Sequence, residues 1–165
     1  MSEVRSDTVA LPPRDALLTC LRSDAWADAL LGGAPYPTRT ALEEAALRAA
    51  RDLDDDALDQ ALAAHPRIGD RPQGDGVEAA HSRREQSGVS DDDPLAARLR
   101  ETVRAYEERF DRVFLVRAAG RSTSDLLALA RQRLGHDRSL EDVVVREQLG
   151  EIAVLRLRPL VEEPA

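Results

Sequence analysis

The sequence predicts an all-α protein built as a single compact multi-helix domain. Apolar residues recur at three- and four-residue steps over most of the chain, and helix-start and helix-stop residues separate these runs. Only one stretch has the β-branched and aromatic content of an extended segment. A length of 165 residues suits one core. We expect a flexible N-terminal tail over 1–11, the helical domain over 12–161 and a C-terminal tail over 162–165.

The first part of the domain has the pattern of four helices. They are expected over 14–23, 24–33, 40–53 and 54–65. Gly32 and Gly33 close the second helix as its C-cap. Thr40 and Glu43 have the spacing of a capping box at the start of the third. An aspartate cap precedes the fourth helix, which runs into His65.

The second part begins with an irregular stretch, because two prolines and three glycines within 66–76 prevent a continuous helix. Helices are then expected over 77–88, 93–110, 122–135 and 139–163. Gly88 stops the first of these, and Asp93 with Pro94 starts the second. Residues 112–120, with the sequence RVFLVRAAG, are predicted to be extended.

The composition excludes several classes of function. A net charge of −8 disfavours binding to nucleic acid and to anionic membranes. The chain has no lysine, which excludes Schiff-base chemistry and the usual pyridoxal phosphate anchor. The single cysteine, Cys20, has apolar neighbours and is expected to be a buried core residue. No long apolar run is present, so we expect a cytoplasmic protein.

His65 is the first candidate catalytic residue. Pro66 drives it out of the α region and ends the helix there, so the imidazole extends from a fixed backbone toward the loop that follows. Histidine titrates near neutral pH and can donate or accept a proton. The alternative is a capping role on the carbonyls of the preceding helix, and from these residues alone it is slightly favoured.

The segment SRREQ gives a second candidate. On a helix, Ser82, Glu85 and Gln86 lie on one face at i, i+3 and i+4, which suits a small polar ligand. A solvated helix face is the alternative. A zinc site formed by His65, His81, Glu85 and His136 is a further reading, but no metal-binding motif supports it. In the last helix, Arg156 follows an apolar run and would need an anion there, from a protein carboxylate or from a ligand.

The order of these segments resembles a known family. AHPRIGDR, SRREQSGV, YEERF, FLVRAAGRS, ARQRLGHD and REQLGEIAVLRLRPL together closely resemble the OHCU decarboxylases, over nearly the whole chain. These enzymes act on 2-oxo-4-hydroxy-4-carboxy-5-ureidoimidazoline in urate breakdown. The resemblance implies an all-α enzyme that needs no metal or organic cofactor, takes a small ureide as substrate and forms homodimers.

The resemblance also implies residue roles. The family's catalytic histidine and glutamate correspond to His65 and Glu85. Substrate contacts correspond to Pro66, Ser82, Gln86, Phe114, Leu115, Val116 and Ala118, and the arginine of the last helix corresponds to Arg156. Four positions depart from the usual pattern. Val103 replaces an asparagine, Asp111 a glycine, Arg117 a cysteine and His136 the asparagine of a GND motif. These departures concern local geometry and substrate affinity more than the reaction.

Three other classes of function stay open from the sequence. They are a ureide-binding helical module without turnover, a metal-dependent hydrolase and a helical protein–protein adaptor. Turnover would exclude the first, and a metal assay on the purified protein would test the second. The adaptor would make the proline-fixed histidine and the polar helix face accidental.

Overall fold

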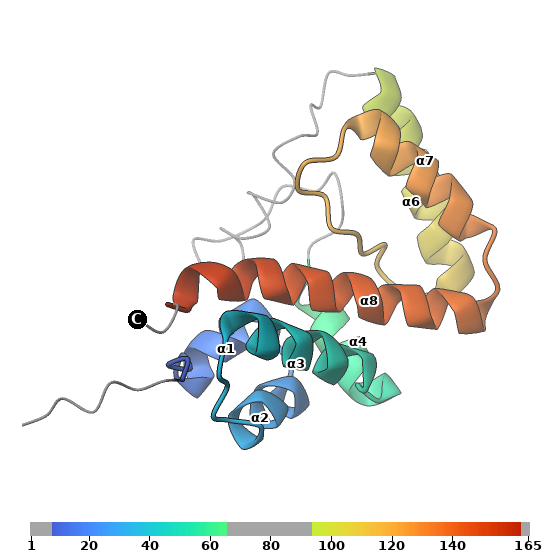
Figure 1. Ribbon diagram of the computed structural model, residues 1–165. Helices are drawn as coiled ribbons and strands as arrows, with labels where there is room; N and C mark the ends of the chain where they lie inside the picture. Colours follow the sequence, from blue (N-terminus) through green and yellow to red (C-terminus); the bar gives the residue numbers. More distant parts are fainter. Residues whose placement is uncertain (1–7, 66–93, 163–165) are drawn as a thin grey trace, which may run out of the picture. The chain divides into compact units, whose positions relative to one another are not determined.

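The computed structural model describes residues 8–65 and 94–162, and this part of the chain is helical (Figure 1). The helices are α1 (Arg14–Cys20), α2 (Asp24–Gly32), α3 (Arg39–Arg51), α4 (Asp55–Ala63), α6 (Pro94–Phe110), α7 (Thr123–Leu134), α8 (Arg138–Leu157) and the 3-10 helix η1 (Arg158–Leu160). Within the described ranges no strand forms, and one isolated bridge joins Val9 to Tyr36. The all-α prediction is confirmed.

The predicted aspartate cap of α4 is confirmed, because Asp54 accepts from the Ala57 amide at 2.8 Å, whereas Asp93, the cap predicted for the helix over 93–110, lies outside the described residues. The first helix, predicted over 14–23, ends at Cys20. Ser23 accepts a hydrogen bond from the Trp26 amide, which explains why α1 ends before it and α2 starts after it. The capping box proposed at Thr40 is wrong. Thr38 is the N-cap of α3, and its hydroxyl accepts from the Ala41 amide at 3.1 Å.

The C-terminal helix also ends earlier than expected. The periodicity predicted one helix to residue 163, whereas α8 ends at Leu157 and gives way to η1. Pro159 accounts for this, because it lacks an amide proton and restricts the residue before it. The α2 C-cap is Gly33 as predicted, with φ −86°. A side chain there would collide with the Tyr36 hydroxyl, so glycine is required for this hydroxyl to lie close to the backbone of residue 33.

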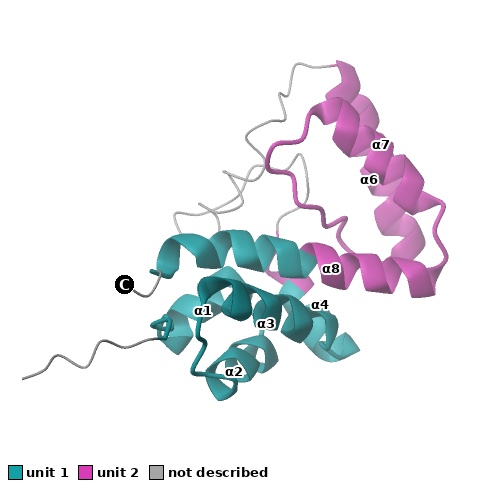
Figure 2. Ribbon diagram, viewed as in Figure 1, with its two compact units in different colours: residues 1–61, 149–165 teal, residues 62–148 magenta. Residues whose placement is uncertain are grey.

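The chain divides into two compact units, 1–61 with 149–165 (unit 1) and 62–148 (unit 2) (Figure 2). Unit 1 packs around Trp26, which is fully buried and donates from its indole nitrogen to the Ala46 carbonyl at 3.0 Å. Gly150 of α8 allows close packing, because a Cβ there would lie 3.1 Å from that of Ala50. These contacts join α2, α3 and the last part of α8 into one core.

Unit 2 has an aromatic core. The Tyr106 ring packs against Phe110 at 4.7 Å and edge-on against Phe114 at 4.9 Å between centroids. Leu126 and Ala130 of α7 complete the same cluster. Residues 112–120, which connect α6 to α7, belong to no helix, as the sequence predicted (Figure 1).

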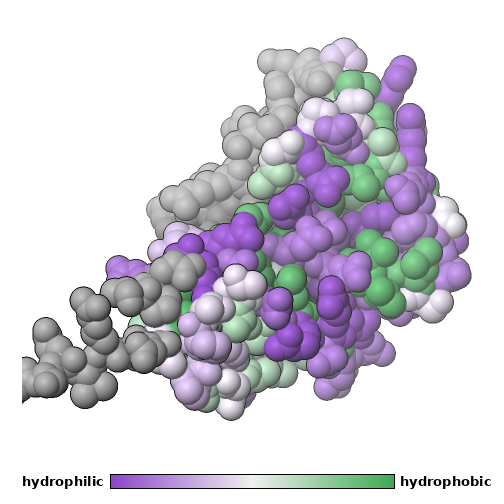
Figure 3. All heavy atoms as spheres, in the orientation of Figure 1, coloured by the Kyte–Doolittle hydropathy of each residue, from purple (hydrophilic) through white to green (hydrophobic). Residues whose placement is uncertain are grey.

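The surface shown in Figure 3 is mainly hydrophilic, with apolar side chains in separate patches. Among the described residues, the large apolar side chains that are exposed are Leu31, Leu140, Val143 and Leu160. None of the helices described in the structure combines the length and apolarity that a membrane span requires. The charged side chains therefore lie on the outer faces of the helices, and the apolar stripes face inward.

Candidate active site

His65 lies just beyond the end of α4, as predicted. Its backbone amide donates to the Leu62 carbonyl at 3.0 Å, which ties the residue to the last turn of the helix. The residue is 8% exposed and therefore buried. The remaining predicted members of this part of the site lie outside the described residues: Pro66, Ser82, Glu85 and Gln86. Their roles stay predictions.

The second part of the predicted site is the segment from Phe114 to Ala118. Phe114, Leu115, Val116 and Ala118 are all buried, although they belong to no regular element. A buried segment of this kind must find partners for its backbone polar groups outside a helix or sheet. Side chains supply two of them. Arg133 donates to the Leu115 carbonyl, and the Gln148 side-chain oxygen accepts from the Arg117 amide at 2.9 Å.

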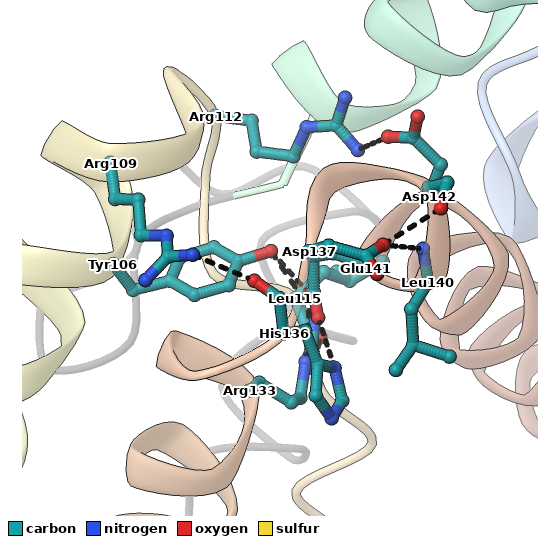
Figure 4. Close-up of polar contacts among 11 residues, drawn as sticks. Tyr106, Arg109, Arg112, Leu115, Arg133, His136, Asp137, Leu140, Glu141 and Asp142 are labelled. Atoms are coloured by element: carbon teal, nitrogen blue, oxygen red, sulfur yellow. Dashed lines mark hydrogen bonds and ion pairs between the residues drawn. The ribbon is translucent and has the colours of Figure 1, made fainter.

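Arg133 belongs to a buried polar network that sequence reasoning missed (Figure 4). Glu141 is fully buried, and one of its oxygens accepts from the Arg133 guanidinium, with Nε at 2.8 Å. The Tyr106 hydroxyl donates to the same oxygen at 2.5 Å. The other Glu141 oxygen lies 2.9 Å from Nδ1 of His136. We call Tyr106, Arg133, His136 and Glu141 the buried network.

The buried network satisfies the condition under which proteins tolerate buried charge, because the carboxylate and guanidinium pair directly and bond to further polar groups. The Arg133 guanidinium also lies over the rings of Phe114, at 4.6 Å from the centroid, and Tyr106, at 5.4 Å. Burial, and then the hydrogen bond to Glu141, raise the pKa of Tyr106. The phenol therefore stays neutral and acts as a donor at physiological pH.

His136, one of the departures from the family pattern, has a defined place in this network. Besides contacting Glu141, it accepts at its backbone carbonyl from Arg109 at 2.9 Å. The next residue, Asp137, caps the start of α8 by accepting from the Leu140 amide at 2.8 Å. That bond, with a further one from the Ser139 hydroxyl, lowers the pKa of Asp137. The histidine at position 136 therefore lies beside the start of α8, which Asp137 stabilises as its cap.

The start of the extended segment is held by an ion pair. Arg112, whose side chain is 9% exposed, lies 2.6 Å from an Asp142 carboxylate oxygen at the beginning of α8 (Figure 4). A second departure lies next to it, since Asp111 adopts a left-handed φ of 51° directly after α6. Glycine favours this conformation and aspartate tolerates it, so the helix can still end here.

Arg156 is described within unit 1. It is 4% exposed and therefore buried, and its Nη1 donates to the Cys20 carbonyl at 3.2 Å. Cys20 is fully buried, as expected. Burial is the main reason that the pKa of the Cys20 thiol is raised to about 11, so the thiol is not an activated nucleophile.

The zinc reading gains no support from the part of the chain that can be described. Residues 8–65 and 94–162 contain no group of three or more histidine, cysteine, aspartate or glutamate side chains arranged to hold a metal ion. Of the four residues proposed, His81 and Glu85 lie outside these ranges. His136 is engaged with Glu141 instead.

Comparison with known proteins identifies the family. The model of the OHCU decarboxylase family matches residues 13–158. The fold is similar to a crystal structure of OHCU decarboxylase in the presence of (S)-allantoin, with a TM-score of 0.69 and 20% identity over 90% of this chain and 98% of that one. It is also similar to a crystal structure of (S)-allantoin synthase, with a TM-score of 0.63 and 21% identity.

The second comparison covers 88% of this chain but only 48% of the allantoin synthase chain. A search of curated proteins gives no match. At these identities the two solved structures establish the fold, whereas the family model covers most of the sequence itself. The chain belongs to the OHCU decarboxylase family and is therefore a carboxy-lyase with a role in urate catabolism.

Proposed function

We propose that this protein catalyses the decarboxylation of 2-oxo-4-hydroxy-4-carboxy-5-ureidoimidazoline to (S)-allantoin and CO2 without a cofactor. The main support is the family match over residues 13–158. The likeness to a structure obtained in the presence of (S)-allantoin agrees with a ureide product. The buried segment from Phe114 to Ala118 agrees with a site that excludes water from part of the ligand.

The chemistry suits the residues available. The substrate carries its carboxylate on a carbon next to a C=N bond, so the electron pair released when the carbon–carbon bond breaks can move toward the ring nitrogen. The carbon that loses CO2 becomes the ring carbonyl when its hydroxyl gives up a proton, and a proton must reach the neighbouring, ureido-bearing carbon from one face to give a single enantiomer. The substrate provides the electron sink, and the protein contributes positioning, electrostatics and proton delivery.

In this proposal His65 moves the proton, either at the 4-hydroxyl or to the new stereocentre. The hydrogen bond from its backbone amide to the Leu62 carbonyl and the burial of the residue support a fixed position. Glu85 hydrogen-bonds the ring or ureido nitrogens and sets the protonation of His65. The remaining contacts would be made by Pro66, Ser82, Gln86, Phe114, Leu115, Val116 and Ala118, with Arg156 balancing anionic charge.

The test generates the unstable substrate in place from urate, with urate oxidase and hydroxyisourate hydrolase, and follows allantoin by circular dichroism. The uncatalysed reaction gives racemic allantoin, so a single enantiomer formed rapidly is the diagnostic result. We expect this signal with the wild-type protein and its loss in His65→Ala. Racemic product at the uncatalysed rate from folded wild-type protein would contradict the proposal.

Conservative variants separate the two catalytic roles. His65→Asn should abolish most of the rate, and Glu85→Gln should lower turnover. The matched control is His136→Asn, which restores the residue usual in the family and should preserve activity. A largely active, folded His65→Asn protein would refute the proton-transfer role, and unchanged turnover in Glu85→Gln would make Glu85 a surface residue.

The assembly and location inferred from the family are also open to measurement. We expect a homodimer, which size-exclusion chromatography with light scattering would detect. We expect cytoplasmic enzyme activity, which fractionation of the source cells would locate. A monomer of full activity would show that the site needs no second subunit.

A further inference from the structure

We propose that Arg133 and Gln148 are positioning residues that hold the segment from Phe114 to Ala118 so that one edge of its backbone faces the ureide. Neither residue belongs to the set that the family resemblance suggested for the site. The inference rests on the proposed function and adds to it the residues that shape the binding edge.

The first step is that both residues bond to one edge of the segment, which the sequence predicts to be extended. Arg133 donates to the carbonyl of Leu115, and Gln148 accepts from the amide of Arg117. In an extended chain the backbone groups of alternate residues point to the same edge. A carbonyl and the amide two residues later therefore lie side by side, and here α7 and α8 each supply a partner for one of them.

The second step is that the opposite edge is left for a ligand. The backbone of Val116 forms no hydrogen bond within the described ranges, and that of Ala118 forms one, in which its carbonyl accepts from the Arg121 amide. The Val116 amide and carbonyl and the Ala118 amide thus form a row of donor, acceptor and donor. A ureide has the complementary N–H and C=O groups, in the arrangement that one strand presents to another.

The third step explains why an arginine is needed. Its planar guanidinium donates in different directions from one rigid group: Nη1 reaches Leu115, while Nε and Nη2 reach Glu141. Its flat face also covers the Phe114 ring. A lysine could pair with Glu141 through its ammonium group, but it could not hold this carbonyl and this carboxylate in the same geometry.

The experiment compares steady-state kinetics of Arg133→Lys and Gln148→Leu with the wild type. The matched control is Arg131→Lys, since Arg131 is an exposed arginine of the same helix. Contacts made equally in the ground and transition states affect KM rather than kcat. We expect KM to rise about tenfold in Arg133→Lys and about threefold in Gln148→Leu, with kcat within about twofold of the wild type.

A merely structural role would give a different result. Partial unfolding reduces the amount of active enzyme, so it would lower the apparent kcat and leave KM unchanged. Hydrogen–deuterium exchange of the peptide containing 113–118 gives a readout independent of turnover, and we expect faster exchange in both variants than in the control. Gln148→Leu leaves the buried charges intact and keeps the test available if Arg133→Lys does not fold.

The outcomes also separate the two proposals. An inactive, folded wild-type protein would contradict the proposed function. An active wild type with an unchanged KM in folded Arg133→Lys and Gln148→Leu, or with unchanged exchange over 113–118, would overturn the positioning role alone.

Discussion

Replacing Glu141 by glutamine should be among the most damaging isosteric changes in unit 2. Glutamine keeps the shape of the side chain but removes the charge that Arg133 requires. Both residues are buried, with exposures of 0% for Glu141 and 3% for Arg133. Removing one partner of a buried ion pair typically costs about 3–5 kcal/mol, because the other charge stays buried without compensation.

The measurement is urea unfolding followed by far-ultraviolet circular dichroism. With a slope of about 2 kcal/mol per molar urea, a loss of this size lowers the midpoint by roughly 1.5–2.5 M. Glu108→Gln, on the exposed face of α6, is the control and should change stability by less than about 0.5 kcal/mol. A loss below about 1 kcal/mol in Glu141→Gln would refute the assignment of Glu141 as the counter-ion of Arg133.

A double-mutant cycle makes the same argument more specific. Arg133→Met alone leaves the Glu141 carboxylate buried without its cation, whereas the double variant removes both charges. The double variant should therefore be more stable than the sum of the two losses predicts, by about 1–3 kcal/mol. Additive losses would show that the two charges do not interact in the folded protein.

Three further predictions concern individual residues. The Cys20 thiol, with a pKa raised to about 11 by burial, should not react with thiol reagents at pH 8 unless the protein unfolds, as a labelling time course with and without denaturant would show. Asp111→Val should destabilise the protein by about 1–2 kcal/mol, because a β-branched residue is strained at φ 51°, whereas Asp111→Gly should stay close to the wild type in urea unfolding. The pKa of Asp125 is lowered, mainly by the Ser122 amide, so its contribution to stability is present above the unfolded pKa of about 3.9 and is lost as pH falls through the lower folded value. In Asp125→Asn, the melting temperature measured between pH 6 and pH 2 should therefore fall less steeply with falling pH than in the wild type.

Most of the helices could be predicted from the sequence because their signals are local. The caps of α2 and α7 and the apolar stripes of α2, α6 and α7 involve residues within one or two turns of each other. The error at α3 is of the same kind. Thr38 and Thr40 are both suitable N-caps, and their spacing to the residues that follow does not show which hydroxyl meets a free amide.

The buried network could not be predicted in the same way, because Tyr106 and Glu141 are 35 residues apart and meet only after folding. A partial signal was present. Arg133 follows Leu126 and Ala130 on the buried stripe of α7, and Glu141 lies one turn before Val145 on the buried stripe of α8. Two opposite charges on apolar stripes indicate a buried pair, but only the structure shows their connection to the Leu115 carbonyl.

The one-sided anchoring of the segment from Phe114 to Ala118 also bears on self-association. Phe114, Leu115 and Val116 form a short run of high β propensity. The edge at which Val116 forms no hydrogen bond within the described ranges is the kind of template on which a second chain can add as a strand while the protein is incompletely folded. Arg112 and Arg117 flank this run and oppose such stacking through charge repulsion. The departure that places arginine at position 117 should therefore protect, during folding, the backbone edge that we propose faces the ureide.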